Sequence, residues 1–254
     1  MCAKSDPVKV VAAYNIKGGV GKTSTAVNLA YLAARDGFRT LLWDLDPQGS
    51  ATYLLKAEAR VKGGGRALVV GRRTAGDAVR STEIDRLDLI PADFSYRNLD
   101  RELGAAENPT KRLHRLLTPL RTHYDVVVLD CPPSASLMSE SIIRASDVLL
   151  VPLIPTGLSL RTFDQLTEFV GTVEGRAPQI VGFLSMVDRR KRSHRDLAAT
   201  VPRDHPGVRP VVVPSLAVVE QMAEHRTPVP LFAPASPATA AYEQLWDHVR
   251  EAWS

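Results

Sequence analysis

A segment near the N-terminus, Asn15–Thr25, has the composition of a loop that binds phosphate groups: it reads NIKGGVGKTST. It stands between an apolar stretch that predicts a strand, Val8–Tyr14, and a pattern that predicts a helix, Thr23–Arg35. Glycines let a backbone wrap closely around phosphates, and the helix N-terminus adds a positive dipole end. At this spacing Lys22 contacts the β- and γ-phosphates of a nucleotide, and the Thr23 hydroxyl ligates Mg²⁺. The sequence therefore predicts a nucleotide-binding loop.

The residues of this loop that we expect to contact the nucleotide are Lys17, Gly18, Gly19, Val20, Gly21, Lys22, Thr23 and Ser24. Ser24 is expected to reach the α-phosphate. The loop departs from the generic pattern at two positions, because Ile16 stands where that pattern has glycine and Lys17 adds a second lysine. A glycine-rich turn with exposed lysines is the alternative, and the strand–loop–helix context together with further motifs argues against it.

Aspartates follow two other apolar stretches. Asp44 and Asp46 come at the end of Arg39–Leu45 in the segment DLDPQG, and Asp130 follows Val126–Leu129. Because ligands bind at the carboxyl ends of the strands in α/β sheets, we expect these carboxylates to lie near the phosphate loop. An aspartate at the end of such a strand is suited to hold Mg²⁺, often through water.

The order of apolar and helical patterns defines the expected fold. The remaining strand-sized stretches, rich in Val, Ile and Leu, are Leu87–Ile90, Val148–Val151, Ile180–Leu184 and Pro210–Val213. Such runs suit strands that are buried on both faces, and their alternation with helices predicts an α/β fold with a doubly wound, mostly parallel sheet. A last helix, Ala240–Trp253, is expected to pack back on the sheet. No repeat or long linker divides the chain, so residues 1–254 are expected to form a single domain.

Composition excludes several other classes of protein. The chain has 254 residues, of which 44% are hydrophobic and 24% charged, and this excludes a disordered or collagen-like chain. Its apolar runs are too short to span a bilayer, and Met1–Asp6 lacks the apolar core of a signal peptide. Two cysteines are too few for a disulfide framework. These features favour a cytoplasmic protein.

The segment KGGVGKT resembles the deviant Walker A motif of the ParA/MinD family of P-loop ATPases, in particular that of its short, Soj-like partition ATPases. DLDPQG and DCPP are similar to the family's other nucleotide motifs, and Asp147–Leu160 and Val211–Pro228 resemble its later strand–loop segments. The resemblance covers nearly the whole chain. It implies a P-loop fold, ATP and Mg²⁺ as cofactors, and an ATPase with weak basal activity.

The resemblance also implies roles for single residues. Lys17 would reach across a homodimer interface to the nucleotide of the partner, and Asp46 would orient the attacking water. The implied catalytic residues are Lys17, Lys22 and Asp46. The implied metal site consists of Thr23, Asp46 and Asp130. Val211–Pro228 is expected to help enclose adenine, with Pro214 as a contact. Asp44 is expected to be structural.

The densest run of cations, DRRKRSHR at 188–195, is a candidate nucleic-acid contact. Exposed cations follow DNA phosphates without reading sequence, and the corresponding region of the family contributes to non-specific DNA binding. Arg189, Arg190 and Arg192 are therefore the predicted DNA-binding residues. A solvated helix start is the alternative. The sequence departs from many relatives at Ser215–Val218, where those proteins carry basic residues and this chain carries none.

We therefore expect an ATP-dependent dimer that binds double-stranded DNA non-specifically. It would segregate or position a DNA or protein cargo through a ParB-like or other adaptor, in the cytoplasm at the nucleoid. No N-terminal helix-turn-helix domain is expected, since the first strand begins by Val8.

Two alternatives from other classes stay open. One is a MinD-like ATPase at a membrane, although Tyr242–Glu251 has more acids than bases and predicts no membrane contact. The other is an amide- or ring-forming ligase of related fold. Cys131 is expected to be a small buried residue rather than an iron–sulfur ligand, and residues 56–80 are expected to form a mobile loop or short insertion.

Overall fold

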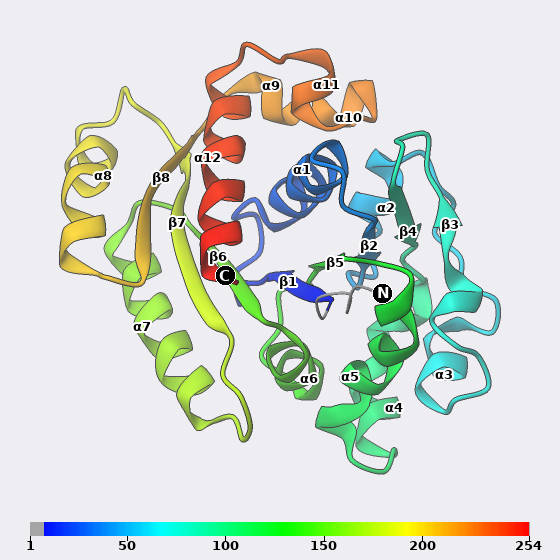
Figure 1. Ribbon diagram of the computed structural model, residues 1–254. Helices are drawn as coiled ribbons and strands as arrows, with labels where there is room; N and C mark the ends of the chain where they lie inside the picture. The colour runs from blue at the N-terminus through cyan, green and yellow to red at the C-terminus, as the bar shows by residue number, and fades with distance from the viewer. Residues whose placement is uncertain (1–7, 254) are drawn as a thin grey trace, which may run out of the picture.

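A central sheet of eight strands runs through the computed structural model, which describes residues 8–253 (Figure 1). The strands are β1 Lys9–Ala13, β2 Thr40–Asp44, β3 Arg80–Ser81, β4 Leu87–Ile90, β5 Val126–Asp130, β6 Val148–Leu153, β7 Gln179–Val187 and β8 Val208–Pro214. Their order across the sheet is β3-β4-β2-β5-β1-β6-β7-β8, and every pairing is parallel except β3–β4. The predicted doubly wound α/β fold is confirmed.

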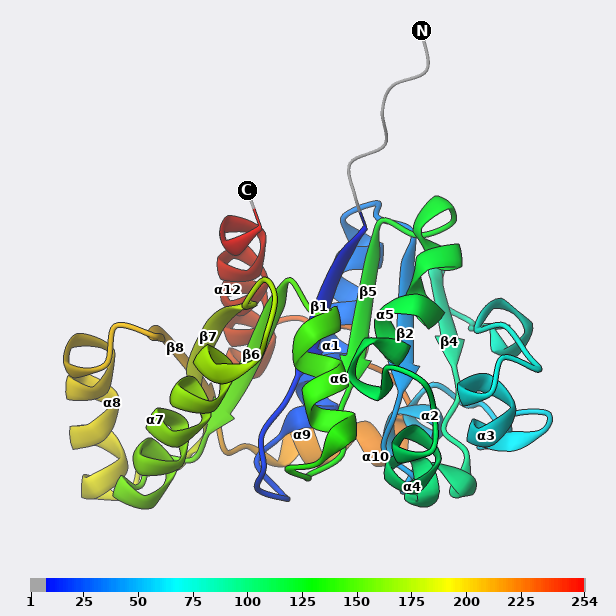
Figure 2. The same ribbon diagram turned by 90° about the horizontal axis from the view of Figure 1, so that it is seen from below.

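Helices cover both faces of the sheet (Figures 1 and 2). They are α1 Lys22–Arg35, α2 Ser50–Leu54, α3 Gly64–Val69, α4 Leu99–Gly104, α5 Arg112–Leu117, α6 Leu137–Ala145, α7 Gly157–Thr172, α8 Arg192–Asp204, α9 Ala217–Glu220, α10 Met222–His225, α11 Val229–Phe232 and α12 Pro237–Ala252. Single 3-10 turns lie at η1 Gly76–Ala78, η2 Phe94–Asn98, η3 Pro109–Lys111 and η4 Thr118–Thr122. Helices α1 and α12 lie on one face, and α4 to α7 lie on the other.

The strands are apolar throughout because both of their faces are covered. All five residues of β5, which reads VVVLD, are buried. Its side chains alternate between two cores, with Val127 and Leu129 in one and Val126 and Val128 in the other. This explains why the sequence shows continuous apolar runs instead of the alternation of a half-exposed strand.

The carboxyl ends of the central strands bring the predicted site residues to one edge of the sheet. Asp44 at the end of β2 lies in register with Asp130 at the end of β5. Asp130 also lies opposite Ala13, the last residue of β1. The phosphate loop follows β1, so it starts beside both carboxylates.

Residues 56–80 were expected to form a mobile loop or a short insertion, and the structure shows a packed unit rather than a loop. This segment contains α3, η1 and β3, and Val61, Leu68 and Val69 are buried. Its glycine triplet is required by packing, because a Cβ on Gly65 would lie 2.7 Å from Cδ1 of Tyr96. The apolar residues are too widely spaced among glycines and cations for the sequence pattern to reveal this small packed unit.

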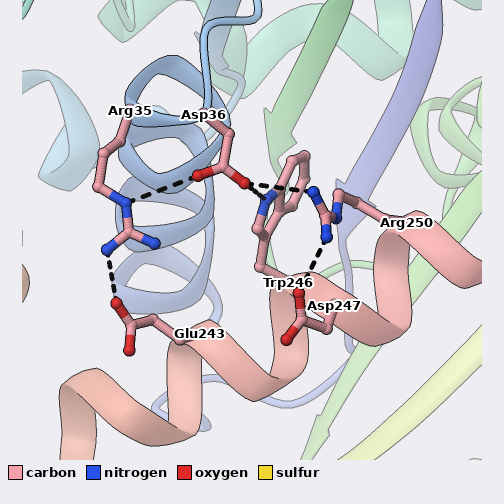
Figure 3. Close-up of polar contacts among 6 residues, drawn as sticks. All are labelled: Arg35, Asp36, Glu243, Trp246, Asp247 and Arg250. Atoms are coloured by element: carbon pink, nitrogen blue, oxygen red, sulfur yellow. Dashed lines mark hydrogen bonds and ion pairs between the residues drawn. The ribbon is translucent and has the colours of Figure 1, made fainter.

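The C-terminal helix α12 packs on strands β7 and β8, as predicted, and also on α1 (Figure 3). The indole Nε1 of Trp246 donates to Oδ2 of Asp36 at 2.8 Å, and Arg35 donates to Glu243 at 2.5 Å. Trp246 is buried, together with Tyr242, Leu245 and Val249 on the same helix. The apolar face of α12 is therefore occupied by the protein core.

Three further observations concern membranes and cysteines. No helix within residues 8–253 is long and apolar enough to cross a membrane. Cys131 is buried, as predicted, and burial raises the pKa of its thiol. Cys2 and the N-terminal residues Met1–Asp6 lie outside the described part of the chain.

Candidate nucleotide-binding site

The phosphate loop is fixed at both ends by specific contacts. The buried Asn15 side chain donates to the carbonyl of Pro152 at 2.8 Å and accepts from the backbone N–H of Lys17 at 3.0 Å. At the other end, Gly21 has a φ of +93°, and a Cβ there would lie 2.8 Å from Oγ of Ser185. Only glycine meets both conditions, so the loop has one well-defined path between β1 and α1.

The side chain of Lys22, which follows the phosphate loop, folds back into that loop. Its Nζ donates to the carbonyl of Lys17 at 2.9 Å, and the residue is 7% exposed. Burial lowers the pKa of this ammonium group, while the charges of Asp130 and Asp46 oppose that shift. A phosphate oxygen arriving in the loop would offer this cation a stronger, charge-assisted hydrogen bond than the carbonyl does.

The carboxylate of Asp130 is buried without a partner. The residue is 0% exposed, and neither carboxylate oxygen receives a hydrogen bond from the described residues. Burial, and then the charge of Asp44, raise its pKa well above the ordinary value, although the nearby Thr23 hydroxyl and the charge of Lys22 oppose the shift. An unpaired carboxylate at this depth is costly unless a cation or a proton neutralises it.

Asp44 and Asp46 are placed differently, although they are neighbours in sequence. Asp44 is buried and accepts from the N–H and hydroxyl of Thr52 at 2.8 and 2.7 Å, and from the N–H of Asp46 at 3.2 Å. Burial raises the pKa of Asp44 to about 6. Asp46 is less buried and accepts from the N–H of Gln48 at 2.9 Å. Asp44 thus holds the turn, and Asp46 faces the pocket.

A pocket of about 470 Å³ opens beside the loop. This volume is in the range of roughly 300–1,000 Å³ that small-molecule sites occupy. The predicted residues that line it are Gly18, Gly19, Gly21, Lys22, Thr23, Ser24, Asp46 and Pro214. Three others do not line it, because Val20 and Asp130 are buried and the side chain of Lys17 lies outside.

Several residues that line the pocket were not predicted individually as contacts. They are Gln48, Ser50, Pro133, Ser185, Met186, Val213, Ser215, Leu216, Val219, Glu220 and Tyr242. Gln48 and Ser50 stand in or beside the DPQG turn, so the motif itself could have indicated them. Pro133 follows β5 in the DCPP motif, and Val213, Ser215, Leu216, Val219 and Glu220 lie in Val211–Pro228, the segment expected to help enclose adenine. Ser185 and Met186 at the end of β7 and Tyr242 of α12 lie outside every segment that was expected to bind nucleotide.

The site has the donors that a nucleotide-bound Mg²⁺ ion needs. The unpartnered Asp130 carboxylate and the Thr23 hydroxyl offer oxygen ligands, and Mg²⁺ usually takes only one or two protein ligands beside phosphates and water. No group of three or more His, Cys, Asp or Glu side chains in the described residues could hold a metal by itself. The residues therefore fit an ion that arrives with its nucleotide.

The buried carboxylate leads to a prediction about stability. In the nucleotide-free protein we expect Asp130→Asn to raise the free energy of unfolding at pH 7.5 by about 1 to 4 kcal/mol, because it removes an unpaired buried charge. The folded pKa of Asp130 lies above the unfolded value, so the destabilisation is absent at low pH. It grows as the pH rises from about 4 through the folded pKa.

Urea denaturation of both proteins between pH 5 and 8 tests this prediction. The free energy of unfolding of the wild type should fall more steeply with pH than that of the variant. The variant should keep a smaller slope from Asp44, whose pKa is raised to about 6. Parallel pH profiles would contradict the assignment of Asp130 as an unpaired carboxylate.

Comparison with known proteins defines the class. The family model described as an AAA domain matches residues 8–181. The chain is 33% identical to the sporulation initiation inhibitor protein Soj of Bacillus subtilis, over 93% of this chain and 96% of that protein. It is 34% identical to the chromosome partitioning protein ParA of Caulobacter vibrioides, over 95% of this chain and 93% of that protein.

Two solved structures show the same fold. The complex of Cyanothece McdA, an aspartate-to-alanine variant, with ATP has a TM-score of 0.82 at 21% identity and covers 97% of this chain and 96% of that chain. Cobyrinic acid a,c-diamide synthase from Mycobacterium smegmatis, with bound ADP and magnesium, has a TM-score of 0.79 at 24% identity and covers 97% and 95%. At these identities the likeness extends to the fold alone.

The sheet order, the glycine loop between β1 and α1, and the aspartates at the ends of β2 and β5 define a P-loop ATPase. The chain belongs to the ParA/MinD family of these ATPases. ATP and Mg²⁺ are the predicted cofactors; of the two solved structures named above, the McdA complex holds ATP and the diamide synthase holds ADP and magnesium.

Proposed function

We propose that this chain is a partition or positioning ATPase that dimerises with ATP, binds duplex DNA non-specifically and moves a DNA or protein cargo. Its ATP hydrolysis would be slow until a ParB-like or other adaptor stimulates it. The protein would act in the cytoplasm at the nucleoid. The observation that carries the proposal is the nucleotide site, in which Lys22 lines the pocket while Lys17 stands outside it. The relatedness to Soj and ParA over more than nine tenths of the chain supports it.

The proposed mechanism relies on positioning and charge. Lys22 and the N–H groups of the loop bind the β- and γ-phosphates, and Asp46 orients a water molecule toward the γ-phosphate. Thr23 and Asp130 would hold Mg²⁺, which would supply charge neutralisation for the phosphates. Adenine would lie against Pro214 at the end of β8 and the residues that follow it.

Lys17 would act on the nucleotide of a partner chain. Its backbone N–H is fixed by Asn15 at 3.0 Å, but its side chain does not line its own pocket. If the Lys17 side chain reaches a nucleotide pocket only from a second copy of the chain, ATP turnover by the monomer should be slow. Steady-state hydrolysis with and without duplex DNA tests the proposal: we expect slow basal turnover that DNA and adaptor raise. Fast turnover by a monomer alone would contradict it.

The proposed DNA contact is the turn after β7. Its backbone is fixed by two side chains of α8: the N–H of Asp188 donates to His194 at 3.1 Å, and Arg195 donates to the carbonyl of Arg189 at 2.8 Å. Arg190 is bound by Asp188, with Nε to Oδ1 at 2.9 Å, and its hydrogen bonds lower the pKa of Asp188 to about 2. This turn begins just beyond Ser185 and Met186, which line the nucleotide pocket, so its position can respond to nucleotide.

The predicted DNA-binding residues differ in whether a carboxylate already neutralises their charge. Among the described residues Arg189 has no carboxylate partner, while Arg190 is paired with Asp188 and Arg192 lies 3.6 Å from Asp196. We expect Arg189→Ala to weaken DNA binding more than Arg190→Ala does. Filter binding with ATP at several salt concentrations measures this. The triple alanine variant at 189, 190 and 192 should reduce the slope of log affinity against log salt by about 2 to 3, and an unchanged slope would contradict the assignment.

The two alternative functions receive less support. A membrane-anchoring C-terminal helix needs an exposed apolar face, but Trp246 and its apolar neighbours on α12 are buried against α1 and the sheet. A ligase would need a second small-molecule pocket at the phosphate end. The pocket that holds Lys22 and Asp46 extends to the residues at and after the end of β8, where a base would bind.

A further inference from the structure

The segment of residues 56–80 carries an excess of positive charge. It contains seven Lys or Arg residues and two acids, whereas the whole chain has a net charge of +4. The segment therefore holds more net positive charge than the complete protein. Nothing in the nucleotide site uses these cations.

The cations of this segment are presented on a fixed framework. Val61 is anchored by its N–H, which donates to Oδ2 of Asp93 at 2.8 Å, and Gly65 is anchored by its N–H, which donates to Oγ of Ser95 at 2.8 Å. The apolar side chains Leu68 and Val69 point into the core. Lys56, Arg60, Lys62, Arg66, Arg72 and Arg80 are exposed. The cations therefore form an outer surface rather than a solvated random loop.

Four of these cations line one open hollow of about 660 Å³, formed by Lys56, Arg60, Lys62 and Arg80. Lys56 is neutralised by an ion pair with Glu83. Within residues 8–253, Arg60, Lys62 and Arg80 have no ion pair with a carboxylate. The lining also contains Glu58, so the hollow carries four cations and two acids, a net charge of +2. It lies beside the edge strand β3, which pairs with β4 on one side only.

We infer that this hollow binds the phosphate backbone of duplex DNA and is a second DNA-contact surface, separate from the turn after β7. The inference rests on the proposed DNA binding. The two surfaces lie at opposite ends of the sheet, with β3 at one end and β7 and α8 toward the other (Figure 1). Each surface adds counterion release to binding without reading base sequence.

The lining of the hollow favours phosphates over an acidic peptide. Protein interfaces are centred on aromatic and other large apolar side chains, but the largest apolar residue in this lining, Leu55, is 6% exposed. The rest of the lining is charged or small and polar, with Ala57 as the exception. Phosphate binding requires only cations and hydrogen-bond donors at the surface, which this hollow provides.

The test is a triple variant, Arg60→Ala/Lys62→Ala/Arg80→Ala, assayed with ATP against a 40-base-pair duplex (about that length) over a range of KCl concentrations. We expect the slope of log affinity against log salt to fall by about 2 to 3, since each lost phosphate contact accounts for about 0.9. Basal ATP hydrolysis and the thermal unfolding temperature should not change, because these side chains are exposed and lie outside the nucleotide pocket.

Two controls sharpen the result. Lys111→Ala/Arg115→Ala/Arg176→Ala removes the same charge from exposed positions elsewhere and should leave the slope within experimental error. Arg60→Lys/Arg80→Lys keeps the charge of the hollow and should retain the wild-type slope. A loss of the slope in the charge-conserving variant would overturn the inference.

The remaining outcomes separate this inference from the proposed function. If the wild type binds no DNA with ATP, both are overturned. If the wild type binds DNA and the triple variant keeps the same slope, only the second surface is overturned. If the triple variant loses binding to polyglutamate but keeps its DNA slope, the hollow is a site for an acidic protein, and the inference is wrong.

Discussion

Replacing Asp46 with alanine is expected to reduce steady-state ATP hydrolysis by at least about 100-fold, while ATP still binds. Removal of a group that positions or activates the nucleophile typically costs about 10² to 10⁴ in rate. Asp46 lines the pocket, whereas Asp44 is buried and bound by Thr52, so we assign the proposed water-positioning role to Asp46. Phosphate release measures turnover, and a fluorescent ATP analogue measures binding.

The matched control for this variant is Asp85→Ala. Asp85 is an exposed carboxylate far from the pocket, with a side chain that is 96% accessible, so turnover should not change. A fall in ATP affinity as large as the fall in turnover would assign Asp46 to metal binding. Unchanged turnover would contradict its catalytic role altogether.

Replacing Lys22 with alanine is expected to weaken ATP binding by at least about 100-fold. The loss of a charge-assisted hydrogen bond to a phosphate in a partly desolvated loop costs about 3 kcal/mol, which corresponds to that factor. Lys22 is 7% exposed and its ammonium group already lies within the loop, so little reorganisation is needed for it to meet phosphate. Isothermal titration with ATP and Mg²⁺ measures the effect.

Lys17→Ala is the informative comparison for Lys22→Ala. Lys17 is the other lysine of the loop, but its side chain does not line the pocket of its own chain. We expect this variant to keep ATP binding by the monomer and to lose ATP-dependent dimerisation and DNA-stimulated turnover, measured by light scattering and phosphate release. Equal losses of ATP affinity in both variants would contradict the proposal that Lys22 binds ATP within its own chain and Lys17 contacts the nucleotide of the partner.

The regular part of the fold could be predicted because its signals are local. Parallel strands buried on both faces produce continuous apolar runs, and each expected strand exists with an error of a few residues at its ends. Strand β7, for example, extends from Gln179 to Val187, because its ends are fixed by pairing with β6 and β8 rather than by composition. Small packed units such as α3 depend on partners distant in sequence, and these were missed.

The sequence by itself determined the phosphate loop and the identities of its charged residues, because both depend on the spacing of adjacent residues. It also determined which strands end in aspartate. Only the tertiary structure decided how these groups differ. Asp44 and Asp130 are both strand-end aspartates, yet one is saturated with hydrogen bonds and the other has none.

The same distinction applies to the positive charge. The sequence located two basic segments, but it gave no measure of which cations are available to a ligand. The structure shows Arg190 paired with Asp188 and Lys56 paired with Glu83, while Arg189, Arg60 and Lys62 have no such partner among the described residues. Charge in a sequence becomes available to a partner only where the fold leaves it exposed and unpaired, because hydrogen bonding, ion pairing and burial all act over a few ångströms in space and not along the chain.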